Sequence, residues 1–241
     1  MSLILLPLIA LLTSVVSAVI GMGGGVLLIS IMTFFLPYQI IIPIHGVVQF
    51  ISNGSRGLFL IKHVRWRFVQ FFLIGAPFGY WVAYYVLKNF TSPNFYYLML
   101  ACFILYTVFK PKKLPQIKLK TLGWTVLGFF AAIQGSLLGA SGPLIAPFYV
   151  RDDLKKEEII ATKAMQQIFI HMFKIPLFIQ LEFDYLEYSA LIILMSAGAL
   201  LGSALGVKIL GKVSESIFKK LFKTVLVIAA ARLIYKFGVG I

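Results

Sequence analysis

Long apolar runs follow one another along almost the whole chain, and this feature constrains the fold more than any other. Most approach or exceed the ~20 residues that a helix needs to cross a bilayer, and they cover residues 3–35, 40–61, 68–87, 95–109, 121–150, 159–181, 186–210 and 217–237. The chain is 60% hydrophobic and 12% charged, whereas a soluble domain is roughly 45–50% apolar and about 25% charged. The runs are continuous rather than alternating, which excludes a β-barrel. The sequence therefore predicts an all-α polytopic membrane protein.

The formal net charge is +14, but the positions of the basic residues explain it without a nucleic-acid partner. They gather between the apolar runs, where Lys and Arg set the orientation of a membrane protein. The sequence has no pair of buried carboxylates, no cluster with metal-ligand spacing and no nucleophile with a placed base. We therefore expect no enzyme, no catalytic residue, no metal and no cofactor. The expected partners are a small anion and the lipid bilayer, and the oligomeric state is left open.

The second half of the sequence repeats glycine and polar positions of the first half. Gly21 falls on Gly139 and Gly24 on Gly142 at a shift of 118 residues. The same shift pairs Gln49 with Gln167, Asn53 with His171, Arg56 with Lys174 and His45 with Lys163. Such matches inside apolar runs predict an internal duplication. We expect a single membrane domain, 1–241, with repeats 1–110 and 121–241 joined by a basic linker, 111–120.

The first run of each half, 3–35 and 121–150, is too long for one crossing and too short for two. If each crosses once, ten basic residues fall on one side and nine on the other. If each is a re-entrant hairpin, the count becomes sixteen against three. The positive-inside rule favours this second arrangement, with two inverted repeats, each a glycine-broken helical hairpin plus three transmembrane helices. It predicts a multi-pass protein of the cell (inner) membrane, with basic loops and central linker cytoplasmic and both termini outside.

The glycine-rich stretch 21–25 interrupts the first of these runs. Irregular backbone at membrane depth is tolerated only where it is buried in protein or lines a wet cavity. We expect a new helix to begin near Val26, and the free N–H groups at its start to attract an anion. The backbone candidates for binding are Gly23, Gly24, Gly25 and Val26.

The second half carries a degenerate copy of this stretch, "GASGP". Ser141 stands where a helix N-cap is expected, and Pro143 stands at a favoured first helical position. Ser141 and Gly142 are therefore the binding candidates of the second copy. The alternative interpretation is that both glycine clusters only allow close helix packing.

Three cations stand well inside apolar runs, Arg56, Lys163 and Lys174, and no acidic residue does. A charge near the bilayer centre costs at least about 2.5–3.5 kcal/mol, so each is a functional candidate. We predict that Arg56 and Lys174 neutralise a bound anion from the two repeats. The alternative is that the side chains extend to the interface, for which Lys163 is best placed.

Polar residues at helical spacing precede two of these cations. Gln49, Asn53 and Arg56 follow an i, i+4, i+7 pattern, which places them on one stripe of a helix. The second half repeats this pattern at Gln167, His171 and Lys174. We interpret the paired stripes as a translocation path, with interhelical hydrogen bonding as the alternative. His45 and His171 are candidates for carrying protons.

The motif "GMGGGVLLI", the basic segment "IKHVRWR" and the second motif "GASGPLIAP" together resemble the TauE/SafE sulfite exporter family, also called the 4-toluene sulfonate uptake permease family. The resemblance covers nearly the whole chain, including its length and two-fold repeat. It implies membrane transport of small sulfur-containing or organic anions, such as sulfite, sulfonates, sulfoacetate or thiosulfate. The second motif departs from the triple glycine at Ser141 and Pro143, so fewer N–H groups are expected there.

Together these features predict a secondary transporter for a small oxyanion, held between the two hairpin tips. Rocking of one half against the other would alternate access to the site. Two alternatives remain: an anion channel that uses the same site, and a membrane scaffold whose glycines serve packing only.

Overall fold

The structure is a computed structural model that describes residues 2–21, 23–89, 92–109, 116–149, 151–209 and 215–239. Within these ranges the chain is helical and contains no strand. The helices are α1 (Ser2–Ile20), α2 (Gly24–Met32), α3 (Tyr38–Phe59), α4 (Trp66–Asn89), α5 (Pro93–Phe109), α6 (Thr121–Leu138), α7 (Gly142–Ile145), α8 (Lys156–Gln180), α9 (Ser189–Lys208) and α10 (Glu215–Val239), with 3₁₀ turns η1 (Ile61–His63) and η2 (Ala146–Tyr149). Met22 and residues 111–115 of the predicted linker lie outside the described residues.

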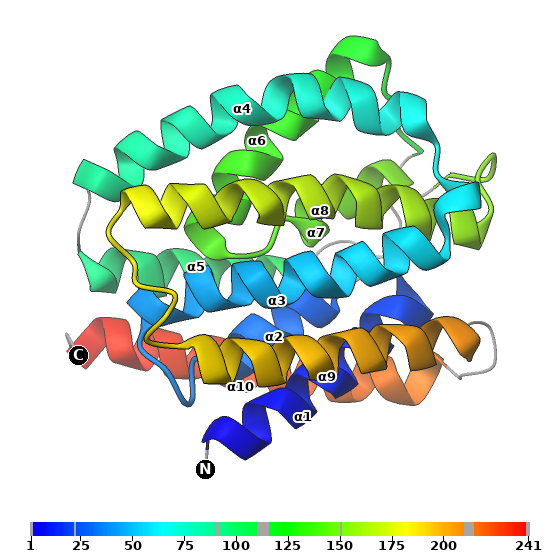
Figure 1. Cartoon of the computed structure of the whole chain (residues 1–241). Helices are drawn as coiled ribbons and strands as arrows, with labels where there is room; N and C mark the ends of the chain where they lie inside the picture. The colour runs from blue at the N-terminus through cyan, green and yellow to red at the C-terminus, as the bar shows by residue number, and fades with distance from the viewer. Residues whose placement is uncertain are drawn as a thin grey trace.

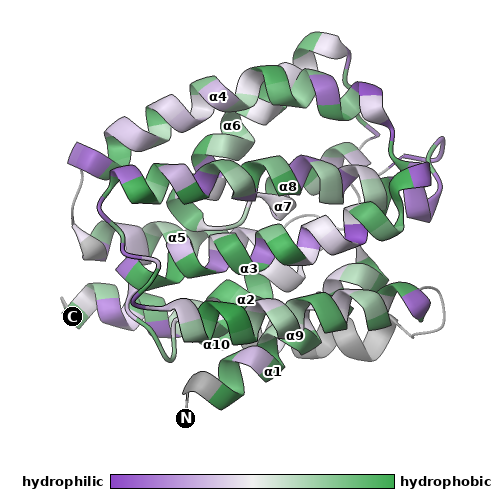
Figure 2. Cartoon of the chain, in the orientation of Figure 1, coloured by the Kyte–Doolittle hydropathy of each residue, from purple (hydrophilic) through white to green (hydrophobic). Residues whose placement is uncertain are grey.

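Three of these helices, α4, α6 and α9, are long and apolar enough to cross a membrane, and α1 and α5 contain shorter apolar stretches. Figure 2 shows hydrophobic residues along most of the helices, with hydrophilic residues at many helix ends and also within α3 and α8. Large apolar side chains also face outward, among them Phe78, Trp81 and Ile193, each about two-thirds exposed. Large apolar side chains exposed in such number are expected where lipid rather than water surrounds the protein. These features agree with the predicted all-α membrane protein.

Two helix pairs approach closely through glycines. α1 runs against α9, and α4 runs against α6 (Figure 1). A Cβ atom at Gly202 of α9 would lie 2.1 Å from the Leu11 carbonyl oxygen of α1, and one at Gly128 of α6 would lie 1.9 Å from the Phe72 carbonyl oxygen of α4. Such backbone contact is typical of membrane helices, because lipid supplies no hydrophobic force between them and close van der Waals packing must do so.

The two predicted interruptions occur where expected. α1 ends at Ile20 and is followed by α2, and α6 ends at Leu138 and is followed by α7. Gly21 has φ +77° and Gly139 has φ +79°, a left-handed conformation that costs other residues roughly 1–2 kcal/mol. The new helix begins at Gly24 rather than near Val26. Gly23 takes the left-handed N-cap conformation, so the first helical turn starts two residues earlier than predicted.

The segments on either side of the second hairpin meet at one end of the bundle. Before α6, the Gln116 side-chain amide donates to the Asp152 carboxylate, which follows η2. At the same end, Arg65 forms a 2.7 Å ion pair with Glu158 at the start of α8. In Figure 1 the two chain termini lie toward the opposite end of the view. The second hairpin therefore leaves and returns at one end.

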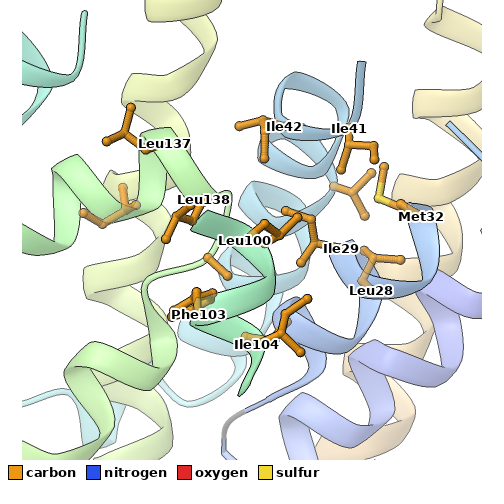
Figure 3. Close-up of a cluster of buried hydrophobic side chains, with 14 of the residues drawn as sticks. Leu28, Ile29, Met32, Ile41, Ile42, Leu100, Phe103, Ile104, Leu137 and Leu138 are labelled. Atoms are coloured by element: carbon orange, nitrogen blue, oxygen red, sulfur yellow. The ribbon is translucent and has the colours of Figure 1, made fainter. Parts of the chain in front are cut away.

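A buried apolar cluster fixes α2 inside the bundle. The members labelled in Figure 3 come from α2, α3, α5 and α6: Leu28, Ile29, Met32, Ile41, Ile42, Leu100, Phe103, Ile104, Leu137 and Leu138. Leu28, Ile29 and Met32 of α2 are fully buried. Because α2 is only nine residues long, this packing, rather than intrinsic helix propensity, holds it in place. The cluster therefore positions the glycine tip that precedes α2.

Candidate functional site

The two glycine tips meet α3 and α8 around a small central cavity. Its volume is about 50 Å³, and since one water needs roughly 10–15 Å³, it has room for a few waters or one small oxyanion. Its lining comes from both tips and both central helices: Ser17, Gly21, Gly23, Gly25, Val26, His45, Gln49, Asn53, Arg56, Ala140, Gly142, Pro143, Ile160, Lys163, Ala164, Gln167 and His171. α3 and α8 lie side by side at the centre of Figure 1. The paired polar stripes of the sequence therefore meet in three dimensions.

The cavity wall is cationic and rich in hydrogen-bonding groups. Arg56 and Lys163 contribute positive charge, and none of the described residues in the wall is acidic. Both cations are almost completely buried, at 5% and 4% exposure. A cleft lined by one sign of charge in a low-dielectric surrounding attracts ligands of the opposite sign. The cavity is therefore suited to an anion.

Arg56 is held by its neighbours on α3. Its Nη1 donates to Ser52 Oγ at 3.0 Å, and its Nη2 donates to Asn53 Oδ1 at 2.5 Å. Ser52 in turn contacts Ser14 Oγ of α1 at 2.9 Å and Ser203 Oγ of α9 at 3.2 Å. A guanidinium group has five N–H donors, so these bonds orient Arg56 and leave other donors for a ligand. The side chain is 5% exposed and therefore points into the protein.

Two lysines of α8 each bind a carbonyl at a hairpin tip. Lys163 Nζ donates to the Gly21 oxygen at 3.0 Å, and Lys174 Nζ donates to the Gly139 oxygen at 2.6 Å. Gly21 follows the last residue of α1, and Gly139 is the C-cap of α6. The end of a helix leaves carbonyls without intrahelical partners and carries the negative end of the dipole, so a cation stabilises it. Lys163 is 4% exposed and is thus held inside the protein.

His45 and His171 lie together beside the cavity. Their ring centroids are 5.8 Å apart, with the ring planes at 70°. His45 Nε2 is 2.9 Å from the Gly25 carbonyl oxygen, which can only accept a hydrogen bond, so Nε2 carries the proton in the neutral ring. The Nδ1 atoms of both rings are buried and have no hydrogen-bond partner.

The structure brings most of the predicted site residues together. Those that line the cavity are Gly23, Gly25, Val26, Gln49, Asn53, Arg56, Gly142, Gln167 and His171. The other three, Gly24, Ser141 and Lys174, lie behind the wall. A Cβ at Gly24 would lie 2.0 Å from the Thr13 carbonyl oxygen, so this glycine serves the packing of α2 on α1. Lys174 is fully buried and holds the second tip.

Ser141 occupies the predicted N-cap position, but its side chain makes no capping bond. Its Oγ instead accepts a hydrogen bond from Gln167 Nε2 at 2.8 Å. The helix that follows, α7, has only four residues, so the dipole effect expected from a second helix start is small.

Several wall residues are absent from the predicted binding set. Lys163 is predicted as a functional cation or an interfacial one, and His45 as a proton carrier. Ser17 and Ile160 had no signal of their own. Ser17 precedes Gly21 by one turn of α1, and a Cβ at Gly21 would lie 2.8 Å from Ile160 Cγ1, so the tip itself brings both to the cavity.

The fold and the site thus define a polytopic helical membrane protein with a cationic central cavity between two glycine tips. The family model of the sulfite exporter TauE/SafE matches residues 6–233, which is nearly the whole chain, and the protein belongs to this family. The resemblance found in the glycine and basic motifs is confirmed. Membership implies a membrane transporter of the sulfite-exporter type. No curated protein and no solved structure matches the chain.

Proposed function

We propose that the protein is a secondary transporter that moves a small sulfur-containing or organic oxyanion across the cell membrane. The observation that carries this proposal is the central cavity, whose wall includes the buried cations Arg56 and Lys163 and, among the described residues, no acidic one. A buried site of positive potential attracts a small oxyanion. The cavity volume of about 50 Å³ matches a small inorganic or short organic anion better than a large one.

In this proposal Arg56 binds the anion through its remaining planar N–H donors, and Lys163 acts as a point charge. The start of α2 adds N–H groups, since Gly25 and Val26 lie in its first turn and line the cavity. Gln49 and Gln167 contribute amide groups from the two central helices. Because α7 is a single turn, the first tip carries more of the binding than the second.

We propose the inverted-repeat arrangement as well. The packing of α1 on α9 is matched by that of α6 on α4, which are their equivalents in the repeat. The positive-φ glycines Gly21 and Gly139 occupy equivalent positions. The segments around Arg65, Gln116 and Glu158 gather at one end, which supports cytoplasmic basic loops, re-entrant hairpins and outside termini.

Alternating access is supported by a second cavity beyond the central one. It has a volume of about 620 Å³, and its lining includes Tyr38, Ile42, Tyr96 and Phe178. Ile42 precedes His45 by about one helical turn, so the two cavities follow each other along α3. In a carrier, rocking of the repeats would open the route between them while closing the other side.

The test is binding and flux with the purified protein. Calorimetry with sulfite, thiosulfate and sulfoacetate measures binding, and Arg56→Gln is expected to weaken it about 10- to 100-fold, the value of a charged hydrogen bond. Arg67→Gln, at an exposed arginine, is the matched control and should bind normally. Saturable exchange in proteoliposomes supports a carrier. Flux without saturation indicates the channel, and absence of binding to any of the three anions indicates the scaffold.

A further inference from the structure

His45 is the ionisable side chain that touches both hairpin tips. Its Nε2 donates to the Gly25 carbonyl of the first hairpin at 2.9 Å. On its other side, a Cβ built at Gly139 of the second hairpin would lie 3.6 Å from His45 Nδ1. The ring is fully buried yet forms part of the cavity wall. A change of charge on this ring would therefore act on both tips at once.

The position that would take up a proton is defined by the hydrogen bond to Gly25. Because Nε2 already donates to a carbonyl, the neutral ring has its free lone pair on Nδ1. Nδ1 is buried without a hydrogen-bond partner, which is uncommon for a polar atom in a native interior. Nδ1 is therefore the ring atom that would bind a second proton.

The groups around His45 oppose that proton when the cavity holds no anion. From α8 it faces Lys174 and His171, and Lys163 of α8 and Arg56 of α3 line the same cavity. The packed helices α2 and α6 contain no titratable side chain. A further positive charge among these cations is unfavourable, whereas an anion in the cavity reverses the balance.

We propose that His45 binds a proton together with the transported anion, so that anion movement is coupled to proton movement in the same direction. This inference rests on the proposed transport function. The proton moves from solution to Nδ1 when the anion enters, and it returns to solution when the anion leaves. The protein therefore ends each transport cycle in the protonation state in which it began. Only one of the two histidines is protonated at a time. A second positive charge on His171, whose ring centroid lies 5.8 Å from that of His45, would be repelled by the same cations. By linkage, the anion and the proton increase each other's affinity by the same factor.

The test is the pH dependence of anion binding to the purified full-length protein, with thiosulfate as the probe. Thiosulfate keeps its charge near neutral pH, whereas sulfite changes its charge there. The affinity of the wild type for thiosulfate is expected to fall by up to about tenfold per pH unit as the pH rises, over the range in which His45 is protonated in the complex and not in the free protein. In weakly buffered solution, about one proton should be taken up for each thiosulfate bound.

His45→Gln keeps an N–H donor for Gly25 but cannot bind the proton, so its thiosulfate affinity should not change with pH. His171→Gln is the matched control at an equally buried ring, and it should keep the wild-type slope whatever its absolute affinity. The proposal is overturned if wild-type affinity for thiosulfate is independent of pH and no proton is taken up, even if sulfite binding depends on pH. It is also overturned if His171→Gln, and not His45→Gln, removes the slope. Absence of any thiosulfate or sulfite binding would refute the transport function itself, which distinguishes the two failures.

Discussion

Replacement of Gly139 by alanine tests whether the second hairpin tip is built as the structure indicates. The residue has φ +79°, and a side chain there costs roughly 1–2 kcal/mol in backbone strain. The new Cβ would lie 2.1 Å from Ile29 Cδ1 and 3.0 Å from Ile42 Cδ1, both in the buried cluster. Overpacking of this kind adds about 1–3 kcal/mol. We therefore expect Gly139→Ala to lower the free energy of unfolding by about 2–5 kcal/mol.

The matched control is Gly54→Ala, in the interior of α3, where a Cβ would meet nothing within 4 Å. Alanine is a better helix former than glycine, so this variant should be up to about 1 kcal/mol more stable than the wild type. Unfolding of both variants in detergent, followed by circular dichroism, measures the difference. A Gly139→Ala protein as stable as the wild type would show that the tip does not need a left-handed residue. Equal destabilisation of both variants would mean that any change of glycine is harmful.

Three further outcomes follow from the same geometry. Arg56→Lys should weaken thiosulfate binding about tenfold in calorimetry, because an ammonium group cannot reproduce the planar fork of donors; unchanged affinity would exclude a forked contact. Gly202→Val should destabilise the protein by about 1–3 kcal/mol in detergent unfolding, because its Cβ would lie 2.1 Å from the Leu11 carbonyl oxygen; normal stability would mean that α1 and α9 are not in backbone contact. Hydrogen bonding to Arg151 lowers the pKa of the exposed Asp153 carboxyl to about 2. The pair therefore stabilises the loop above about pH 4, the ordinary pKa of Asp. This stabilisation is lost as the pH falls toward 2 and Asp153 is protonated. In Asp153→Asn, the free energy of unfolding should no longer fall between about pH 4 and about pH 2 on account of this pair. If the variant and the wild type have the same dependence of unfolding on pH, the pair adds no stability.

The helices could be predicted because hydropathy and breaker residues act locally. The run 40–61 corresponds to α3 (Tyr38–Phe59), within two residues at each end. The run 159–181 corresponds to α8 (Lys156–Gln180), which begins three residues earlier and ends one residue earlier. The glycine interruptions could also be predicted, since glycine adopts positive φ more readily than any other residue. The stripes of α3 and α8 could be read from helical spacing, and their meeting at one cavity followed from the proposed repeat.

The hydrogen-bond partners of the buried polar side chains could not be predicted from the sequence. The Ser141 hydroxyl could form a hydrogen bond either with the start of its own helix or with Gln167. It bonds to Gln167 because α8 packs close to it. Lys163 stands near the end of an apolar run, which predicts a side chain that extends to the interface. The structure places the Gly21 carbonyl 3.0 Å from its Nζ, and this contact spans 142 positions of the chain. Tertiary contacts of this length leave no local pattern.

The hydrogen bonds of Lys163 and Lys174 limit how the two hairpin tips can move. Lys163 and Lys174 are about 16 Å apart along α8 at 1.5 Å per residue, and each binds a carbonyl of a different hairpin. α8 therefore cannot shift against either tip without losing a charge-assisted hydrogen bond. Of the two lysines, Lys163 also lines the cavity. Its ammonium group has three N–H donors, so it can hold the Gly21 carbonyl and contact an anion at the same time, while Lys174 holds the second tip. We therefore expect a bound anion to act on the first tip directly through Lys163.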